Sequence, residues 1–235
     1  MKIREQKGRM RHRTPQRNKQ YAVFGLGVFG STVAETLERQ GCEVIAIDKE
    51  IEHVERISKH VTKAVVADAT NKEELLALDI QEVDVVIVSL RNNLEAAVLS
   101  TMLLKELGVP YIIAKAKNHQ HQRILEKVGA DKVVRAEHDM GKRIARGLLH
   151  KSVVDVVALD TRYSISEIKA PATWIGKSIV ELNVRNVYQL NLLGMKKDGS
   201  NDLSLDIDPL APVEKGDSFL VVAKLEDIEK FDYLY

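Results

Sequence analysis

The sequence of 235 residues has one cysteine and no apolar run long enough to cross a membrane. A single cysteine, Cys42, excludes an internal disulfide framework and a zinc site built from cysteine pairs. The apolar stretch Val83–Leu90 contains Asp84 and is much shorter than the roughly 18 residues of a transmembrane helix. The N-terminus is basic but no apolar segment follows it, so we expect no secretory signal and a cytoplasmic location.

The sequence also lacks an excess of charge of either sign, since its net charge is only +1. Residues 1–20 hold eight Lys or Arg against one acid, which leaves 27 basic and 33 acidic residues in the rest. A basic arm can bind nucleic acid or an anionic membrane, or it can be a disordered extension. Because residues 21–235 have a net charge of −6, we expect no nucleic-acid partner.

Short apolar runs alternate with helical periodicity through the first 150 residues. We expect strands at residues 21–24, 43–47, 64–67, 83–88, 111–114 and 132–134, with helices between them. The run at 83–88 is almost wholly apolar, which is typical of a strand covered on both faces of a parallel sheet. Repeated βα units of this length predict an α/β fold with a doubly wound parallel sheet.

The regular alternation of strands and helices ends after a helix expected at residues 139–149. Strands are expected at residues 153–159, 163–169, 190–195 and 218–223, separated by turn signals such as Asp198-Gly199 and Asp208-Pro209. We therefore predict a basic N-terminal extension (1–19), an α/β domain (20–138), a connecting helix (139–151) and a smaller α+β domain (152–235).

The clearest chemical signal is the glycine loop Gly25-Leu26-Gly27-Val28-Phe29-Gly30, which follows a strand and opens a helix. Gly25 permits a tight turn, Gly27 lets the backbone approach phosphates, and Gly30 allows close helix packing. Asp48 ends the second strand, 21 residues after Gly27, where a carboxylate binds ribose hydroxyls. A carboxylate there argues against a 2′-phosphate, so we predict a nucleotide site of the Rossmann type.

Asp68 follows the third strand and lies at the same edge of the predicted sheet. From the residues alone it either caps the helix that starts near Lys72 or meets the base of a nucleotide. Glu137, likewise, is explained by the residues alone as an acid at a helix N-terminus, where the helix dipole favours it.

Signals of catalysis are missing from the sequence. It contains no H-E-x-x-H, P-loop or G-x-S-x-G motif, and His119 and His121 are two residues apart and so not on one helix face. A dehydrogenase needs a domain that encloses a substrate beside the nicotinamide, and the C-terminal part offers no clear general base. We expect a protein that binds a nucleotide without turning it over, and keep a small NAD-dependent oxidoreductase as the alternative.

Several segments together resemble an RCK (regulator of K⁺ conductance) domain and its C-terminal companion, from about residue 19 onward. The likeness is greatest to KtrA-type subunits of bacterial Ktr potassium uptake systems, with TrkA proteins more distant. The segments that carry it are the glycine loop with Asp48, Ala67-Asp68-Ala69-Thr70, Leu103–Gly108, Val128–Asp131 with Glu137–Gly141, and Gly176–Ser178, Leu182–Arg185, Tyr188 and Gly216-Asp217.

The resemblance implies a cytosolic subunit in which ATP or ADP binding controls K⁺ flux, rather than an enzyme. Such subunits form homodimers that assemble into an octameric ring under a membrane-embedded KtrB- or TrkH-like potassium-translocating subunit, so this chain would be peripheral on the cytoplasmic face of the membrane. Two nucleotides with different affinities for two ring states would shift their populations. A stand-alone sensor without a channel is a further alternative.

The resemblance also supplies candidate ligands. Glu137 matches an acidic residue that helps hold a divalent cation, such as Mg²⁺, near the phosphates, and Arg185 and Asn191 match positions that contact cyclic di-AMP. Gln189 stands where the family usually has glycine. The nucleotide contacts predicted by matching motif are Gly25, Leu26, Gly27, Val28, Phe29, Gly30, Asp48, Lys49, Asp68 and Ala69.

Val28 is the main departure from the family pattern. KtrA-type loops usually have an arginine here that reaches the terminal phosphate across the dimer, and valine cannot make such a charge-assisted bond. NAD(H) binding of the TrkA type therefore stays open as the alternative to ATP and ADP.

Overall fold

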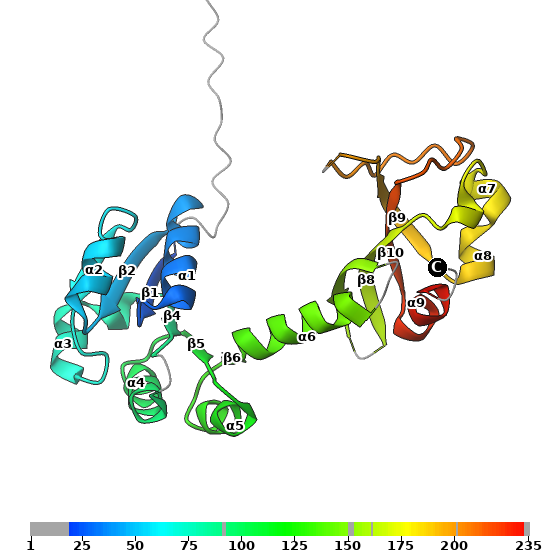
Figure 1. Ribbon diagram of the computed structural model, residues 1–235. Helices are drawn as coiled ribbons and strands as arrows, with labels where there is room; N and C mark the ends of the chain where they lie inside the picture. The colour runs from blue at the N-terminus through cyan, green and yellow to red at the C-terminus, as the bar shows by residue number, and fades with distance from the viewer. Residues whose placement is uncertain (1–18, 91–92, 150–152, 161, 201, 233–235) are drawn as a thin grey trace, which may run out of the picture. The chain divides into compact units, whose positions relative to one another are not determined.

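The computed structural model describes residues 19–90, 93–149, 153–160, 162–200 and 202–232 (Figure 1). The chain divides into two compact units, one ending at Glu137 and the next beginning at His138. The predicted N-terminal extension lies outside the described residues except for Lys19. Residues 150–152, around the predicted start of the C-terminal domain, also lie outside them.

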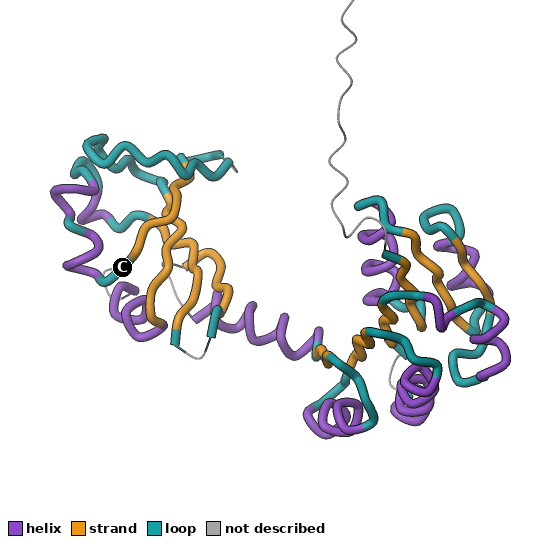
Figure 2. Tube along the Cα trace, turned by 180° about the vertical axis from the view of Figure 1, so that it is seen from behind, coloured by secondary structure: helices purple, strands orange, loops and turns teal. Residues whose placement is uncertain are grey.

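The first unit alternates strands and helices, as its apolar pattern predicts. Figure 2 shows its strands in orange with the helices in purple beside them. In chain order the elements are β1 (Gln20–Phe24), α1 (Val28–Arg39), β2 (Glu43–Asp48), α2 (Ile51–Ile57), β3 (Lys63–Val66), α3 (Lys72–Ala77), a 3-10 helix (Ile80–Glu82), β4 (Val85–Val88), α4 (Leu94–Glu106), β5 (Tyr111–Lys115), α5 (His119–Lys127) and β6 (Lys132–Val134).

The six strands form one parallel sheet in the order β3-β2-β1-β4-β5-β6. The chain runs outward from β1 in one direction through β2 and β3, and then returns to β4 on the other side of β1. At such a point the loops after two neighbouring strands diverge and leave a crevice at the carboxyl ends of the strands. The doubly wound sheet predicted from the sequence is confirmed.

Separate apolar clusters cover the two faces of this sheet. Ala22 and Phe24 of β1 pack with residues of α3, α4 and α5, whereas Val23 packs with α1 and α2 on the opposite face. Every residue of β4 is buried, because this strand lies between β1 and β5 with helices on both sides. The core thus fixes the glycine loop after β1 and the end of β2 on one rigid edge.

Two boundaries differ from the predicted ones by more than one residue. β4 begins at Val85 rather than at residue 83, because the 3-10 helix at Ile80–Glu82 ends directly before Val83. The helix expected at residues 139–149 is α6 (Ala136–Leu149), which starts three residues earlier and runs across the division between the units.

The second unit is a smaller α+β arrangement around a four-stranded antiparallel sheet in the order β7-β8-β10-β9. This agrees with the predicted class of the C-terminal domain. After α6 its elements are β7 (Val153–Ala158), β8 (Tyr163–Lys169), a 3-10 helix (Ala172–Trp174), α7 (Ile179–Leu182), α8 (Val184–Tyr188), β9 (Asn191–Lys196), β10 (Ser218–Lys224) and α9 (Leu225–Asp232).

An aromatic cluster forms the centre of the second unit's core. The ring of Trp174 lies 5.2 Å from that of Tyr188, 5.7 Å from that of Phe219 and 5.2 Å from that of Phe231, measured between centroids. Trp174 and Phe219 are fully buried. Because aromatic pairs with tilted or edge-on rings attract beyond their buried area, this cluster holds α8 and α9 against the sheet.

Candidate nucleotide site

The glycine loop between β1 and α1 depends on two glycines for its shape. Gly25 has φ +88°, and a Cβ there would lie 2.2 Å from the Ser89 carbonyl oxygen. A Cβ on Gly30 would lie 1.9 Å from the Gly25 carbonyl oxygen, so its role is to let α1 pass close to the loop. Both positions exclude any side chain, because the obstructing atoms belong to the backbone.

Gly27, in contrast, faces open space. It is the N-cap of α1, with ordinary extended dihedrals, and nothing lies within 4 Å of a Cβ placed on it. No side chain caps α1 and its first turn holds no acid. Among the described residues, the N-terminal amides of the helix and its positive dipole end therefore have no anion as a partner, which is the arrangement that binds phosphate groups.

Asp48 connects the end of β2 to the glycine loop. Its Oδ2 accepts a hydrogen bond from the Leu26 amide at 2.6 Å and lies 3.0 Å from Nδ1 of His53, and its Oδ1 accepts from the Glu50 amide at 3.0 Å. Burial raises the pKa of Asp48, but these hydrogen bonds outweigh it and leave the pKa below its ordinary value. The carboxylate is therefore ionised and firmly placed at neutral pH.

Asp68 lies across from Asp48, at the end of β3. Its Oδ1 accepts from the amide and the hydroxyl of Thr70, at 2.8 and 2.6 Å, and its Oδ2 pairs with Nζ of Lys49 at 2.8 Å. Partial burial raises the pKa of Asp68, whereas the bonds from Lys49 and Thr70 lower it, with a net lowering. The two acids and Lys49 thus form a charged border at the crevice.

The interpretation of Asp68 as a helix cap is wrong. Asn71 is the N-cap of α3, and its side-chain oxygen accepts from the amides of Glu73 and Glu74. Asp68 stands three residues too early for that role, and its carboxylate closes a local turn with Thr70 instead. The remaining alternative from the sequence, contact with a nucleotide base, is compatible with this position.

A cavity of about 210 Å³ opens at this edge of the sheet. It is lined from the ends of β1, β2, β3 and β4 and from the start of α4, so it occupies the crevice that the strand order creates. Of the ten predicted nucleotide contacts, Gly25, Asp48, Lys49, Asp68 and Ala69 line it; the other lining residues are Ile47, Glu50, Ala67, Thr70, Leu90, Asn93 and Ala96.

The other predicted loop residues lie differently. The side chain of Leu26 is fully buried in the core, so only its backbone amide serves the site. Val28 is 91% exposed at the first position of α1 and makes no wall of the cavity. Phe29 lies in the first turn of α1 and is half-buried, and its ring lies 5.6 Å from Nζ of Lys115.

Glu137 and Lys115 form an ion pair at the same edge of the sheet, beyond the glycine loop. Lys115 ends β5 and Glu137 lies in the first turn of α6. The hydrogen bond from Lys115 is the main cause of a lowered pKa of Glu137. Within the described residues, no three His, Cys, Asp or Glu side chains gather into a metal site, so Glu137 alone could supply only one ligand to a divalent cation.

The second unit brings Arg185 and Asn191 together. Both line a cavity of about 420 Å³ between α7, α8 and β9, with Asn183, Leu190 and Leu192 among its other walls. Gln189 follows α8 with φ +59°, a left-handed conformation that glycine adopts more easily, and it does not line this cavity.

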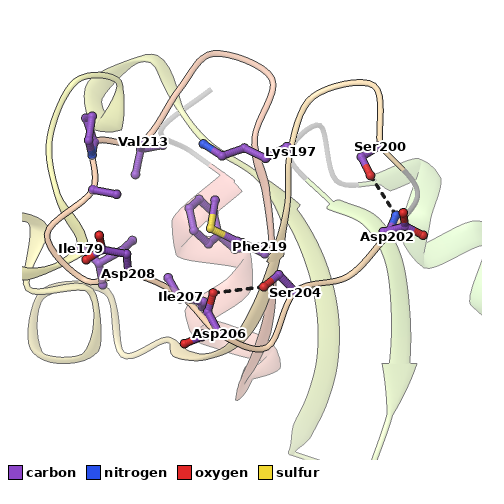
Figure 3. A pocket seen from close by; sticks show the side chains of 13 residues that line it. Ile179, Lys197, Ser200, Asp202, Ser204, Asp206, Ile207, Asp208, Val213 and Phe219 are labelled. Atoms are coloured by element: carbon purple, nitrogen blue, oxygen red, sulfur yellow. Dashed lines mark hydrogen bonds between the residues drawn. The ribbon is translucent and has the colours of Figure 1, made fainter.

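A separate cavity of about 330 Å³ lies in the same unit, between α7, β9, β10 and the segment that joins the two strands (Figure 3). Phe219 and Val213 form part of its apolar wall, and Lys197 and Asp206 stand at its border. None of the predicted site residues lines it.

Eight residues at the nucleotide site were not among the predicted contacts: the seven other lining residues named above, and His53. His53 contacts Asp48 from α2, and Leu90 and Asn93 line the cavity after β4. Asn93 directly precedes an apolar helical stretch, so the usual N-cap signal would have placed it at the carboxyl edge. His53 carries no such signal, because its position relative to Asp48 depends on how α2 turns back along β2.

The strand order and the glycine loop define a Rossmann-type domain, followed by a small α+β domain. Two family models match these parts: the TrkA-N domain over residues 21–136 and the TrkA-C domain over residues 163–234. Ktr system potassium uptake protein A of Bacillus subtilis (strain 168) is 40% identical over 216 residues, which are 92% of this chain and 96% of that protein. Ktr system potassium uptake protein C of the same organism is 35% identical over 91% of this chain and 96% of its own length.

Among solved structures, the GsuK RCK domain superposes with a TM-score of 0.64 at 19% identity over 92% of this chain. The GsuK channel bound to NAD gives 0.65 at 17% identity and the same coverage. This chain spans 47% and 39% of those two chains, and at this identity the likeness shows the fold alone. The chain belongs to the Ktr and TrkA family of potassium uptake proteins, with one TrkA-N and one TrkA-C domain.

In the part of the chain that the structure describes, no helix has the length and apolar character needed to span a bilayer.

Proposed function

We propose that this chain is the cytoplasmic gating subunit of a Ktr-type potassium transporter, in which ATP and ADP compete for the cavity at β1, β2 and β3. The potassium uptake proteins that it resembles over nearly their whole length support the transport role. Potassium would pass through a membrane-embedded partner of the KtrB or TrkH type, to which the chain would attach as a peripheral subunit. The transporter would have two conformational states, and each nucleotide would shift their populations toward the state that binds it more tightly. The size of the shift is set by the difference in the affinity of that nucleotide for the two states.

One observation carries the nucleotide assignment: the Leu26 amide of the glycine loop donates to the ribose-side carboxylate of Asp48 at 2.6 Å. This bond sets the distance between the helix N-terminus, which would hold the phosphates, and the carboxylate, which would hold the ribose. A nucleotide held in this way would meet the predicted contacts Gly25 and Gly27 with its phosphates, and Asp48, Lys49, Asp68 and Ala69 with its ribose and base.

ATP and ADP are the ligands we favour, and the glycine loop itself offers no cationic side chain to their terminal phosphate. Val28 is exposed and uncharged, so it supplies no charge to a terminal phosphate. NAD(H) is the alternative, since it uses the same carboxylate and helix N-terminus, and one similar structure is of the GsuK channel bound to NAD. An oxidoreductase is disfavoured, because the similar proteins are potassium uptake proteins and the described residues of the cavity wall include no histidine to act as a base.

A divalent cation such as Mg²⁺ would be held by Glu137 together with the phosphates. Glu137 is paired with Lys115, so binding of the cation must displace that lysine from the carboxylate. The displaced ammonium would remain near the glycine loop, where the ring of Phe29 contacts it. The exchange keeps the charge balanced at the phosphate end of the site.

Assembly into dimers and then into an octameric ring is supported by an apolar stripe on α6. Met140, Ile144 and Leu148 recur every fourth residue and are 51%, 57% and 82% exposed. Side chains four residues apart lie on one face of a helix, and a face of this kind is expected to pack against another protein surface. We expect Ile144→Asp to yield smaller assemblies than the wild type in sedimentation velocity, whereas Lys142→Asp, on another face, should not.

Cyclic di-AMP is proposed as the ligand of the cavity that Arg185 and Asn191 line. An arginine offers a forked donor to phosphate and an asparagine amide can both donate and accept. The cavity has a volume of about 420 Å³ in a single chain and is open to solvent, so a second subunit could complete it.

Calorimetric titration of nucleotide-stripped protein with ATP, ADP, NAD and NADH, with and without Mg²⁺, tests the nucleotide assignment. Binding of ATP and ADP that Asp48→Ala abolishes would support it, provided that circular dichroism shows the variant folded. Tight NADH binding with weak ATP binding would favour the NAD(H) sensor, and no binding of any of the four would contradict the proposed function.

A further inference from the structure

His53 engages the carboxylate that would bind the ribose. Its Nδ1 lies 3.0 Å from Oδ2 of Asp48, and the two side chains are only 13% and 12% exposed. Because the Asp48 carboxylate is ionised, it can only accept, so Nδ1 of His53 carries the proton of this hydrogen bond. His53 lies on α2, five residues after Asp48, and holds this contact without taking part in the wall of the cavity.

The acceptor capacity of Asp48 is therefore largely used. A carboxylate offers about four lone-pair directions, two on each oxygen. The Leu26 amide and His53 occupy both directions of Oδ2, and the Glu50 amide occupies one direction of Oδ1. One direction, on Oδ1, remains for a ligand at the cavity.

Recognition of a ribose by both of its hydroxyls needs two free directions, one for each. Oδ1 can serve one hydroxyl, whereas the second would have to displace His53 from Oδ2. Displacement would break the hydrogen bond that the largely buried His53 imidazole makes to Asp48, which costs free energy.

We propose that His53 is a specificity-determining residue of the nucleotide site, which restricts Asp48 to a single ribose hydroxyl. The inference rests on the proposed function, since it requires a nucleotide in the cavity. One hydroxyl is held by a charge-assisted hydrogen bond to Oδ1, and the other is not held by Asp48. The site consequently distinguishes nucleotides that lack one hydroxyl from nucleotides that lack the other.

Titration with ADP, 2′-deoxy-ADP and 3′-deoxy-ADP tests this inference on the full chain. We expect one deoxynucleotide to bind about tenfold more weakly than ADP and the other to bind within about twofold, since loss of one hydrogen bond to a charged group has this size. Equal weakening of both analogues, or weakening of neither, would overturn the inference.

Two variants separate a role in specificity from a structural role. His53→Leu removes the donor and opens a direction on Oδ2, so the second hydroxyl gains a partner and both deoxynucleotides should bind more weakly than ADP. His53→Asn keeps an N–H donor on the atom attached to the γ-carbon and should preserve the wild-type pattern. A merely structural effect would change the affinities for ADP and for both deoxynucleotides by the same factor. If the ratios between these three affinities in His53→Leu equal those of the wild type, the inference is overturned.

A failure of the proposed function would give a different result from a failure of this inference. If the wild-type protein binds none of ATP, ADP and NAD, the nucleotide assignment itself is wrong. If it binds ADP but shows no difference between the two deoxynucleotides, only the role of His53 is wrong.

Discussion

The backbone amide of Leu26 donates to the Asp48 carboxylate at 2.6 Å, which joins the glycine loop after β1 to the end of β2. The two features are 22 residues apart in the chain and belong to neighbouring parallel strands. Since the side chain of Leu26 is buried in the core, the loop cannot move away from Asp48 without disturbing packing. The phosphate and ribose parts of the site are thus held at a fixed separation.

Gly27 and Gly30 allow binding and folding to be tested separately. Gly27→Ala meets no atom within 4 Å, so the free energy of unfolding should change by less than about 0.5 kcal/mol. Its methyl group would stand where phosphates approach the helix N-terminus, and ADP affinity should fall about tenfold or more. Calorimetry and thermal melting of the same sample measure both quantities.

Gly30→Ala is the matched control, because its Cβ would meet the Gly25 carbonyl oxygen at 1.9 Å. It should destabilise the protein by about 1–3 kcal/mol. A Gly27→Ala protein that binds ADP as the wild type does would contradict the place that we give to the phosphates.

Acid sensitivity should arise in part from Asp48. Its pKa is lower in the folded protein than in the unfolded chain, where it is about 3.9. Such a group stabilises the fold above the unfolded pKa, and this stabilisation is lost as pH falls through the folded pKa. We expect Asp48→Asn to lower the melting temperature at pH 7 and to reduce its fall below about pH 4. Asp202→Asn, at an exposed carboxylate of the second unit, should leave the pH profile unchanged.

The role proposed for Glu137 predicts a specific loss of cation dependence. In Glu137→Gln the carboxylate ligand is gone, so Mg²⁺ should no longer strengthen ATP binding, while binding without Mg²⁺ should not weaken. Lys115 is freed from its ion pair in this variant and can approach the phosphates. Glu126→Gln, on the exposed side of α5, should keep the Mg²⁺ effect. Retention of the full effect by Glu137→Gln would exclude Glu137 as a cation ligand.

Cyclic di-AMP binding should depend on Arg185. Removing a forked donor to phosphate from the cavity should weaken binding about tenfold or more in Arg185→Ala. Arg162→Ala serves as the control, since Arg162 lies over the ring of Tyr163 and outside this cavity. Equal affinities of the two variants, measured by calorimetry, would count against the assignment.

The alternating strands and helices of the first unit could be predicted from the sequence. Buried parallel strands appear in it as continuous apolar runs, and the helices show apolar residues at every third or fourth position. The crevice residues Gly25 and Asp48 could be predicted from spacing alone. The turn at Asp68 could not, since Asp68 and Asn71 are both good caps and only the structure shows that Asn71 holds the amides of α3. His53 was missed because its contact depends on the path of α2.

The second unit was harder to predict. The short helix α8 follows α7 through Asn183, which has φ +46°, and the sequence carries no glycine or proline to mark that turn. The predicted domain limits at residues 138, 151 and 152 remain predictions, since α6 spans the division between the units and residues 150–152 lie outside the described part of the chain.

Potassium uptake into vesicles is the most direct test of the central claim. A Ktr-type membrane subunit would be reconstituted with this protein, and the initial rate of uptake measured in ATP and in ADP for the wild type and for Gly27→Ala. The account predicts different rates in the two nucleotides for the wild type and no difference for Gly27→Ala. Equal rates for the wild type, with both nucleotides bound and the complex formed, would contradict it.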